Sequence, residues 1–465
     1  MKHIHFVGIG GTGLSAIARL LIESGYLVSG SDRVLTPLAE QLKSAGAQVF
    51  LGHDPRNIAG ADIVVRSSAV PDENVEVQAA LAAGIPVLKR AQFLGQILAG
   101  HRVIAVAGTH GKTTTSSMIA WTLTAVGRDP SYILGGTSQN LGTNAHAGTG
   151  EDFVVEADEY DRMFLGLRPD LAVITNIEHD HPDCFPTPQE FQQAFLDFAG
   201  LLRAGGVLLV CGDDPGALQL AESERLSHCS IYSYGLGSPS AQDTSDYQAK
   251  EVSLEEPGNY SYAALHRGSF LARVSLGVPG AHNVQNSLAA LAVAHRLGLP
   301  LVDVAAALGE FRGTGRRFEV RGEVGGIVVI DDYAHHPTEI RATLAAARSR
   351  FGDRQLWVVW QPHTYSRTRL LFDEFANAFG DADHVVVTEV YPAREPVQPD
   401  FSARRVVEAM SHPDVDFVPD LVKVTAFLLA RLQPGAILLV LSAGDADQIS
   451  TQVLAALPEQ EEDYA

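Results

Sequence analysis

The sequence is poor in cysteine, has no long apolar run and carries no excess of positive charge. Its 465 residues include three cysteines, Cys184, Cys211 and Cys229, and no two of them have C-x-x-C spacing. This usage is typical of reduced thiols in a cytoplasmic protein. No apolar stretch approaches the ~18 residues that span a bilayer, and Arg19 and Glu23 interrupt the apolar N-terminal segment. We therefore expect neither a membrane span nor a signal peptide.

The charge balance excludes two classes of partner. The chain has 55 Asp and Glu residues against 34 Lys and Arg, which gives a formal net charge of −21. Such a surface repels the phosphates of nucleic acids and of anionic membranes, so we expect neither as a partner. An anionic small substrate then needs a local pocket of cationic side chains or backbone N–H groups.

The length and the hydrophobic pattern predict three α/β domains. At about 150 residues per domain, three units are expected, and buried strands alternate with amphipathic helices, which favours parallel sheets. A new unit begins near "HRVIAVAGTHGK", and the glycine- and arginine-rich "FRGTGRRFEVRG" marks a hinge. We predict a Rossmann-like domain over 1–99, a central P-loop ATPase-like domain over 100–312 and a second Rossmann-like domain over 313–465. Short alternating runs over 228–278 predict antiparallel hairpins.

The stretch "AVAGTHGKTTTSS" (105–117) predicts a phosphate-binding loop between a strand and a helix. Glycines let backbone N–H groups face a phosphate, and the start of the helix adds partial positive charge. Lys112 would neutralise phosphate oxygens and Thr113 would offer a hydroxyl to Mg²⁺. Val106 stands where the standard pattern has its first glycine, so a plain strand–helix turn with an exposed lysine is the alternative. The placement between strand and helix favours phosphate binding.

Two further strands end in acidic residues and histidines. Glu156 ends "FVVEADE" and His181 ends "VITNIEHDH", and the carboxyl ends of parallel strands share the edge that carries the phosphate loop. Mg²⁺ prefers oxygen ligands, which favours Thr113 and Glu156, whereas a histidine is an unusual ligand for it. The alternative is a solvated loop edge, and spacing alone leaves the choice open.

An N-terminal glycine turn, "GIGGTG", also lies between a strand and a helix. Gly8, Gly10 and Gly13 fit the dinucleotide fingerprint, and Asp32 follows about 20 residues later. Such turns also bind UDP-type diphosphates, so the pattern leaves a nicotinamide dinucleotide, a UDP-sugar and an unoccupied turn all open.

In the third unit, "DDYAHHPTE" (331–339) and "QPHTYSRTR" (361–369) each follow an apolar strand. Their side chains could converge at the strand ends on an anionic or amine-bearing substrate, although single histidines are more often packed than functional. The residues concerned are Tyr333, His335, His336, His363, Arg367 and Arg369.

These motifs, in this order, resemble the Mur ligase family. The resemblance rests on "HFVGIGGTGLS", "AVAGTHGKTTT", "EADEYD", "TNIEHDHPD", "VPGAHNVQNSLAA", "GTGRRFE", "DDYAHHPTE" and "QPHTYSRT", and it extends over about residues 3–445. The phosphate loop of that family reads G-T-x-G-K-T/S, so Val106 fits it. The resemblance implies an ATP-dependent ligase that phosphorylates the lactyl carboxylate of UDP-N-acetylmuramate and then transfers the acyl group to L-alanine.

The resemblance also implies a role for individual residues. The UDP-sugar would contact Gly8, Gly10, Gly11, Gly13, Asp32, Ser67 and Ser68. ATP would contact Gly108, Thr109, His110, Gly111, Lys112, Thr113, Thr114, Asn283, Arg317 and Asp332. Mg²⁺, or Mn²⁺ in its place, would contact Thr113, Glu156 and His181, and the amino acid would contact Tyr333, His335, His363 and Arg367. The catalytic set would be Lys112, His335 and Arg367, with His335 as a candidate general base.

Two positions depart from the family pattern. Tyr160 stands where many members have serine, and Thr364 stands where some have arginine. The sequence has no lysine between His181 and Arg203, so we expect no carbamylated-lysine metal bridge. Two alternative activities remain, a recycling ligase that accepts murein tripeptide and a nicotinamide-dependent dehydrogenase. The choice among alanine, glycine and serine, and that between monomer and homodimer, are left open.

Overall fold

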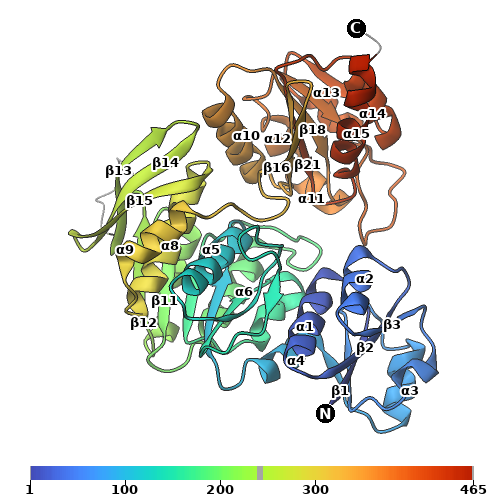
Figure 1. Cartoon of the computed structure of the whole chain (residues 1–465), viewed down its shortest axis with the longest axis vertical. Helices are drawn as coiled ribbons and strands as arrows, with labels where there is room; N and C mark the ends of the chain where they lie inside the picture. The colour runs from blue at the N-terminus through green and yellow to red at the C-terminus, as the bar shows by residue number, and fades with distance from the viewer. Residues whose placement is uncertain (1, 238–244, 463–465) are drawn as a thin grey trace.

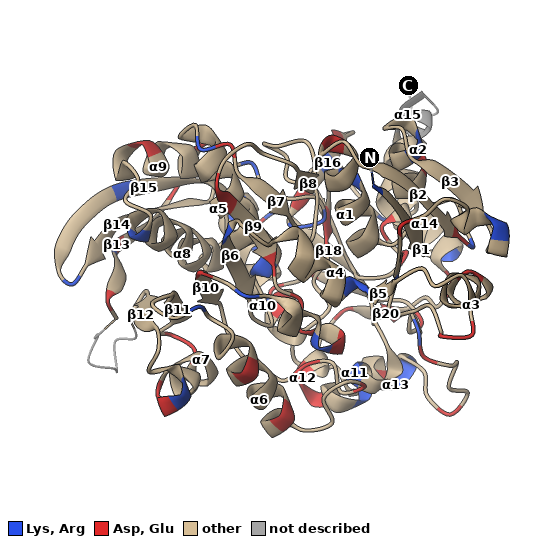
Figure 2. Ribbon diagram, turned by 90° about the horizontal axis from the view of Figure 1, so that it is seen from below, with Lys and Arg blue, Asp and Glu red and all other residues tan. Residues whose placement is uncertain are grey.

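A computed structural model describes residues 2–237 and 245–462 of the chain. They form three α/β domains in chain order, each built on its own sheet (Figure 1). Acidic side chains are spread over outer helices such as α6 (Pro188–Ala199) and α12 (Phe372–Ala376), as Figure 2 shows. Within the described residues, no helix is both long enough and apolar enough to cross a bilayer.

The N-terminal domain has a five-stranded parallel sheet of order β3-β2-β1-β4-β5. Strand order reverses beside β1, and ligands of open parallel sheets bind at that point, where the glycine turn lies. The elements are β1 (His3–Val7), α1 (Thr12–Glu23), β2 (Leu27–Asp32), α2 (Pro37–Ser44), β3 (Gln48–Leu51), η1 (Pro55–Ile58), β4 (Ile63–Arg66), α3 (Val75–Ala82), β5 (Val87–Lys89) and α4 (Arg90–Ile97).

The central domain has a ten-stranded sheet of order β15-β14-β13-β12-β11-β10-β6-β9-β7-β8. The first half of its elements are β6 (Arg102–Ala107), α5 (Lys112–Ala125), β7 (Ser131–Ile133), β8 (Ala145–His146), β9 (Asp152–Glu156), η2 (Tyr160–Gly166), β10 (Leu171–Ile174) and α6. The second half are β11 (Val207–Cys211), α7 (Pro215–Ala221), η3 (Glu224–Leu226), β12 (Ser230–Gly235), β13 (Tyr247–Glu255), β14 (Asn259–His266), β15 (Ser269–Pro279), α8 (His282–Arg296) and α9 (Leu301–Gly309).

The expected antiparallel hairpins begin later than predicted. β12 pairs parallel to both β11 and β13, and antiparallel pairing starts only between β13 and β14. The prediction for residues 230–235 was therefore wrong. A helical connection through α7 returns the chain to the same end of the sheet, which makes β12 parallel to β11. On one face α5 packs against α8, whose Val284, Leu288 and Leu291 are fully buried.

The C-terminal domain has a six-stranded sheet of order β16-β17-β21-β18-β19-β20, with β16 as its antiparallel edge. β17 and β18 lie on either side of β21, so the two polar segments that follow them emerge with one strand between them. The elements are β16 (Glu319–Val324), β17 (Ile327–Asp332), α10 (Pro337–Phe351), β18 (Leu356–Gln361), α11 (Tyr365–Leu370), α12, β19 (His384–Val387), α13 (Arg404–Ala409), β20 (Val415–Phe417), α14 (Leu421–Leu429), β21 (Ile437–Ser442) and α15 (Gln448–Glu462).

Candidate active site

Residues of all three domains line one cleft of about 530 Å³. Gly13 comes from the N-terminal domain, Lys112 from the central domain and His335 from the C-terminal domain. A second cleft, of about 520 Å³, lies between the central and C-terminal domains. Both clefts are lined by Gly111, Thr113, Arg317 and Glu339. The phosphate loop therefore forms part of the wall between two adjacent ligand-sized spaces.

The phosphate loop has a backbone that requires glycine. Gly108 has φ of +140°, and a Cβ there would lie 1.9 Å from Thr175 Oγ1. Gly111 has φ of +79° and immediately precedes α5. The loop residues named by the sequence therefore form a tight turn at the N-terminus of a helix, which is the arrangement that binds phosphate.

Lys112 lies in the interior of the first cleft, folded over its own loop. Its ammonium donates to the carbonyl oxygens of Gly108 at 2.5 Å and Thr109 at 3.0 Å, and to Glu159 at 2.9 Å. Burial alone would lower the pKa of Lys112, but Glu159 and Glu156 raise it above the ordinary lysine value. The ammonium therefore keeps its charge where an anionic ligand would meet the loop.

The three predicted metal ligands line this same cleft. Glu156 accepts from Gly135 N at 2.9 Å, and Thr113 lies beside it. His181 Nε2 lies 3.5 Å from Glu159 Oε1, and its buried Nδ1 has no hydrogen-bond partner among the described residues. Burial raises the pKa of Glu156, while Lys112 lowers it. Clustered carboxylates and an unpartnered imidazole nitrogen are a donor set that fits a divalent cation.

The N-terminal glycine turn faces an arginine that the sequence analysis did not single out. A Cβ at Gly13 would lie 2.2 Å from Arg90 Nη1, and the same guanidinium lies 3.9 Å from Asp158 Oδ2 of the central domain. Arg90 is the first residue of α4, and no motif in the sequence marked it. The turn and Arg90 together place backbone N–H groups and a cation at the rim of the shared cleft.

Asp32 supports the turn itself. Its Oδ2 accepts from Gly10 N at 2.9 Å. A Cβ at Gly8 would lie 3.1 Å from Ser67 Cβ, whereas Ser68 is exposed. Gly11 caps the N-terminus of α1. The structure thus brings Ser67 to the turn and uses one Asp32 oxygen to fix the turn's backbone.

The second cleft contains the other predicted nucleotide residues. Asn283 and Asn286 line it and hydrogen-bond each other at 3.0 Å. Arg317 and Asp332 line it from the other side, and Asp332 accepts from the backbone N of Phe318 at 2.7 Å. Burial raises the pKa of Asp332 to about 6.

The C-terminal histidines meet in the first cleft. His335 and His363 have ring centroids 5.9 Å apart, and His335 Nδ1 lies 2.8 Å from the Tyr333 carbonyl oxygen. Burial lowers the pKa of His335 to about 3 and that of His363 to about 2. Both rings are therefore neutral, and His335 has Nε2 left for a ligand.

Arg367 already has a carboxylate partner. Its Nε and Nη2 bind the two oxygens of Asp180 at 2.8 and 3.1 Å, and its Nη1 lies 3.0 Å from His363 Nδ1. Arg367 and Asp180 are 3% and 4% exposed. Arg369 does not join this group, contrary to the expectation that it converges there, because it pairs with Asp400 at the surface at 2.8 Å. Its position two residues further along α11 turns it to the opposite side of the helix.

Tyr160 and Thr364, which we expect to depart from the family pattern, lie in different surroundings. Tyr160 packs 3.9 Å beneath the guanidinium of Arg394 and donates to Asp183 at 3.3 Å, and Arg394 also binds Asp183 at 2.8 Å. This is a second contact between the central and C-terminal domains. Thr364 is buried with φ of +65°, and its N–H donates to the Tyr391 carbonyl.

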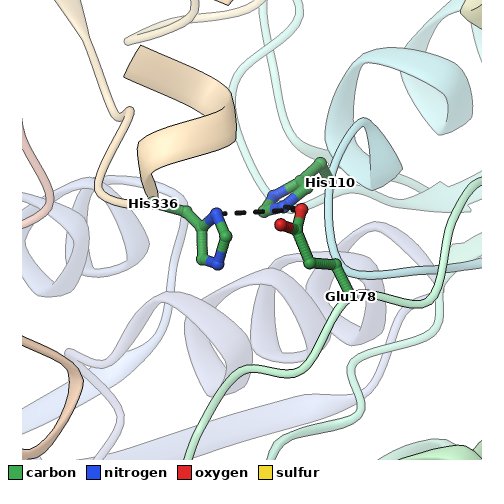
Figure 3. A group of neighbouring side chains, drawn as sticks. All are labelled: His110, Glu178 and His336. Atoms are coloured by element: carbon green, nitrogen blue, oxygen red, sulfur yellow. Dashed lines mark hydrogen bonds and ion pairs between the residues drawn. The ribbon is translucent and has the colours of Figure 1, made fainter. Parts of the chain in front are cut away.

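His110 of the phosphate loop is held between two carboxylates. Its Nε2 lies 2.9 Å from Glu178 Oε2 and its Nδ1 lies 3.2 Å from Glu339 Oε1. Burial would lower the pKa of His110, but Glu178 and Glu339 raise it to about 9. His336, the N-cap of α10, brings a third donor to the group shown in Figure 3, with all three donor atoms within 4.8 Å. His336 Nδ1 accepts from Thr338 N at 3.3 Å, and the ion pair between His110 and Glu178 explains the group without a metal.

Three α/β domains meeting around a phosphate loop define a multidomain nucleotide-binding enzyme. Models of the Mur ligase family match the chain in order: the catalytic domain over residues 3–102, the middle domain over 106–294 and the glutamate ligase domain over 316–444. The chain belongs to the Mur ligase family. The resemblance seen in the sequence is therefore confirmed, and so is the three-domain α/β fold.

Individual relatives match this chain over nearly its whole length. The chain is 44% identical over 470 residues to the UDP-N-acetylmuramate–L-alanine ligase of Roseiflexus castenholzii, covering 98% of this chain and 97% of that one. Among solved structures it matches a UDP-N-acetylmuramate–alanine ligase, MurC, from Thermotoga maritima with a TM-score of 0.83, 28% identity and coverage of 99% and 100%. It also matches a murein peptide ligase from Psychrobacter arcticus with a TM-score of 0.73, 27% identity and coverage of 98% and 99%.

Proposed function

We propose that this chain joins L-alanine to the lactyl carboxylate of UDP-N-acetylmuramate, with conversion of ATP to ADP and phosphate. The observation that carries this proposal is the single cleft lined by Gly13 and Arg90 of the N-terminal domain, by Lys112 and by the His335–Arg367 region. We assign the three substrates to residues 1–99, 100–312 and 313–465, for UDP-sugar, ATP and amino acid respectively. The relatives named for this reaction, at 42–45% identity, support it. Reduced thiols and the use of ATP support a cytoplasmic location.

The chemistry explains the need for three sites. A carboxylate does not accept an amine because its oxide is a poor leaving group, so its oxygen first attacks the γ-phosphate of ATP to form an acyl phosphate. Lys112 offsets the charge that develops on the phosphoryl oxygens. The amine then attacks the carbonyl carbon, and phosphate leaves with the original carboxylate oxygen. Contacts between the domains would exclude water from this intermediate.

Thr113, Glu156 and His181 would hold a divalent cation, Mg²⁺ or Mn²⁺, beside the phosphate loop. When bound, it would neutralise phosphate oxygens. His181 binds a cation only as a neutral imidazole, whereas burial lowers its pKa and Asp180 and Glu159 raise it above the ordinary value. Proton loss from His181 therefore accompanies cation binding.

We assign to His335 the role of orienting the amine. Because Nδ1 contacts the Tyr333 carbonyl, Nε2 carries the lone pair, and the lowered pKa keeps it unprotonated. We propose that Nε2 accepts a hydrogen bond from the attacking amine. Arg367 and His363 would then meet the carboxylate of the amino acid, with Asp180 fixing the plane of the guanidinium.

The alternative amine is a murein tripeptide, and the Psychrobacter structure is named a murein peptide ligase. Its 27% identity is lower than the 44% of the Roseiflexus relative, which favours alanine. A nicotinamide-dependent dehydrogenase is disfavoured by membership of a ligase family.

The test is ADP release with Mg²⁺-ATP and UDP-N-acetylmuramate in the presence of L-alanine, murein tripeptide or no amine. We expect ADP release that depends on alanine. Release with the tripeptide alone would reassign the chain to recycling, and no release with either amine would refute the ligase proposal.

A further inference from the structure

One buried carboxylate contacts three of the segments that line the clefts. Glu339 lies in the first turn of α10, and its side chain is 9% exposed. Its Oε1 lies 3.2 Å from His110 Nδ1 and 3.4 Å from Arg317 Nη1. Its Oε2 accepts from His335 N at 3.0 Å and lies 3.3 Å from His335 Nδ1. The side chain of Glu339 therefore contacts three parts of the site. These are the phosphate loop at His110, the linker between the central and C-terminal domains at Arg317, and His335, the histidine that we assign to the amine.

These contacts cross the boundary between two domains. Arg317 and His335 belong to the same domain as Glu339, whereas His110 belongs to the central domain. His110 in turn holds Glu178, whose other oxygen accepts the Thr338 hydroxyl of α10 at 2.9 Å. Separation of the domains would break the contact between Glu339 and His110 but leave those to Arg317 and His335. Domain closure thus adds a contact from His110 of the phosphate loop to a carboxylate that already contacts His335.

We propose that Glu339 is a positioning residue that links the phosphate loop to His335, so that docking of the nucleotide-bearing domain fixes the carboxylate that holds His335. This inference rests on the proposed function for the role of His335. Glu339 touches the loop, the linker and the histidine and acts through them. Its presence in the wall of both clefts fits this role.

A purely structural role makes a different prediction. An acidic residue in the first turn of a helix stabilises that helix by typically 0.3–1 kcal/mol, and its loss would lower stability without altering the catalytic pH profile. The groups that face His110 are Glu178, Glu339 and the His336 ring. Loss of one carboxylate from this set changes the protonation of His110, which a helix effect alone does not do.

The experiment compares Glu339→Gln, His110→Asn and the double variant in the full-length enzyme. Glutamine keeps the shape and a hydrogen-bond acceptor but removes the charge. We expect each single variant to lower kcat/KM for the amino acid by about 10- to 100-fold, as for loss of a buried charged hydrogen bond. The loss in the double variant should be clearly less than the sum of the two single losses, because both single variants remove the shared contact between His110 and Glu339. Binding of UDP-N-acetylmuramate should change less than about twofold, since that site belongs to another domain.

Asp183→Asn is the matched control. It weakens the contact between Asp183 and Arg394, which joins the same two domains without touching His110 or His335. We expect Asp183→Asn to leave the pH profile of kcat unchanged. Glu339→Gln should lower the pH at which kcat falls on the alkaline side, because His110 would lose its proton at a lower pH. Fully additive losses in the double variant, or an unchanged pH profile in Glu339→Gln, would overturn the proposal.

NMR titration of His110 gives a second readout that needs no turnover. The His110 signal, identified by its absence in His110→Asn, should titrate well above an ordinary histidine in the wild type and closer to that value in Glu339→Gln. If neither enzyme releases ADP, the proposed function fails while this titration still tests the contact. Identical His110 titration in both proteins would overturn the inference.

Discussion

The buried ion pair between Arg367 and Asp180 allows a prediction about domain closure. Both side chains are almost fully buried, and two hydrogen bonds join them across the interface of the central and C-terminal domains. Asp180→Asn removes the charge and keeps the shape. Breaking one partner of a buried pair costs about 3–5 kcal/mol because the other charge stays buried and unpaired.

We expect this cost to act on closure, with little effect on unfolding. If the domains separate, the Arg367 guanidinium is hydrated again, so neither domain contains a buried, unpaired charge. A penalty of 3 kcal/mol or more shifts the closure equilibrium by at least about 100-fold. The prediction is therefore a fall in kcat/KM of at least about 100-fold, with a melting temperature within a few degrees of wild type.

The assay is ADP release together with small-angle X-ray scattering in the presence of ATP and UDP-sugar. Asp400→Asn is the control, since Asp400 pairs with Arg369 at the same 2.8 Å but at the surface, with the side chains 75% and 39% exposed. Exposed pairs contribute about 0–1 kcal/mol, so this variant should keep near-normal activity and compactness. Equal behaviour of the two variants would refute the reasoning about closure.

Two other predictions concern separate parts of the molecule. Lys112→Ala should abolish ADP release while UDP-N-acetylmuramate binding, measured by calorimetry, stays largely intact; loss of that binding would contradict the separation of the two sites. Glu76 is fully buried, and although burial raises its pKa, the nearby His5 ring and hydrogen bonds from Ser31 and Asn57 lower it from 4.5 to about 2. Its contribution of about 3 kcal/mol is present above pH 4.5 and lost as the pH falls toward 2. Urea unfolding at pH 7 and pH 3 should show a smaller pH effect in Glu76→Gln, and equal effects would contradict this assignment.

The sequence predicted the features that depend on residues close together in the chain. The glycine turns at Gly8 and Gly108 need positive φ, and each lies between an apolar strand and a helix, so both were visible in the sequence. Parallel strands end at one edge of the central sheet, which is why Glu156 and His181 line one cleft.

Contacts that form only when domains dock were not predictable. Nothing in the sequence pairs Asp180 with Arg367, 187 positions away, or places Arg90 over Gly13. Arg367 therefore looked like a free anion-binding residue. Glu339 ends the motif "DDYAHHPTE", but nothing in the sequence marked it beyond its place in the first turn of a helix. The parallel pairing of β12 likewise depends on a crossover that its short alternating sequence does not encode.

The most direct test of the account follows one oxygen atom. UDP-N-acetylmuramate labelled with ¹⁸O in its lactyl carboxylate is incubated with Mg²⁺-ATP, L-alanine and the enzyme, and the released phosphate is analysed by mass spectrometry. Because the carboxylate oxygen attacks the γ-phosphate and leaves with it, one ¹⁸O should appear in each phosphate. Alanine-dependent phosphate release without ¹⁸O would contradict carboxylate activation in this cleft.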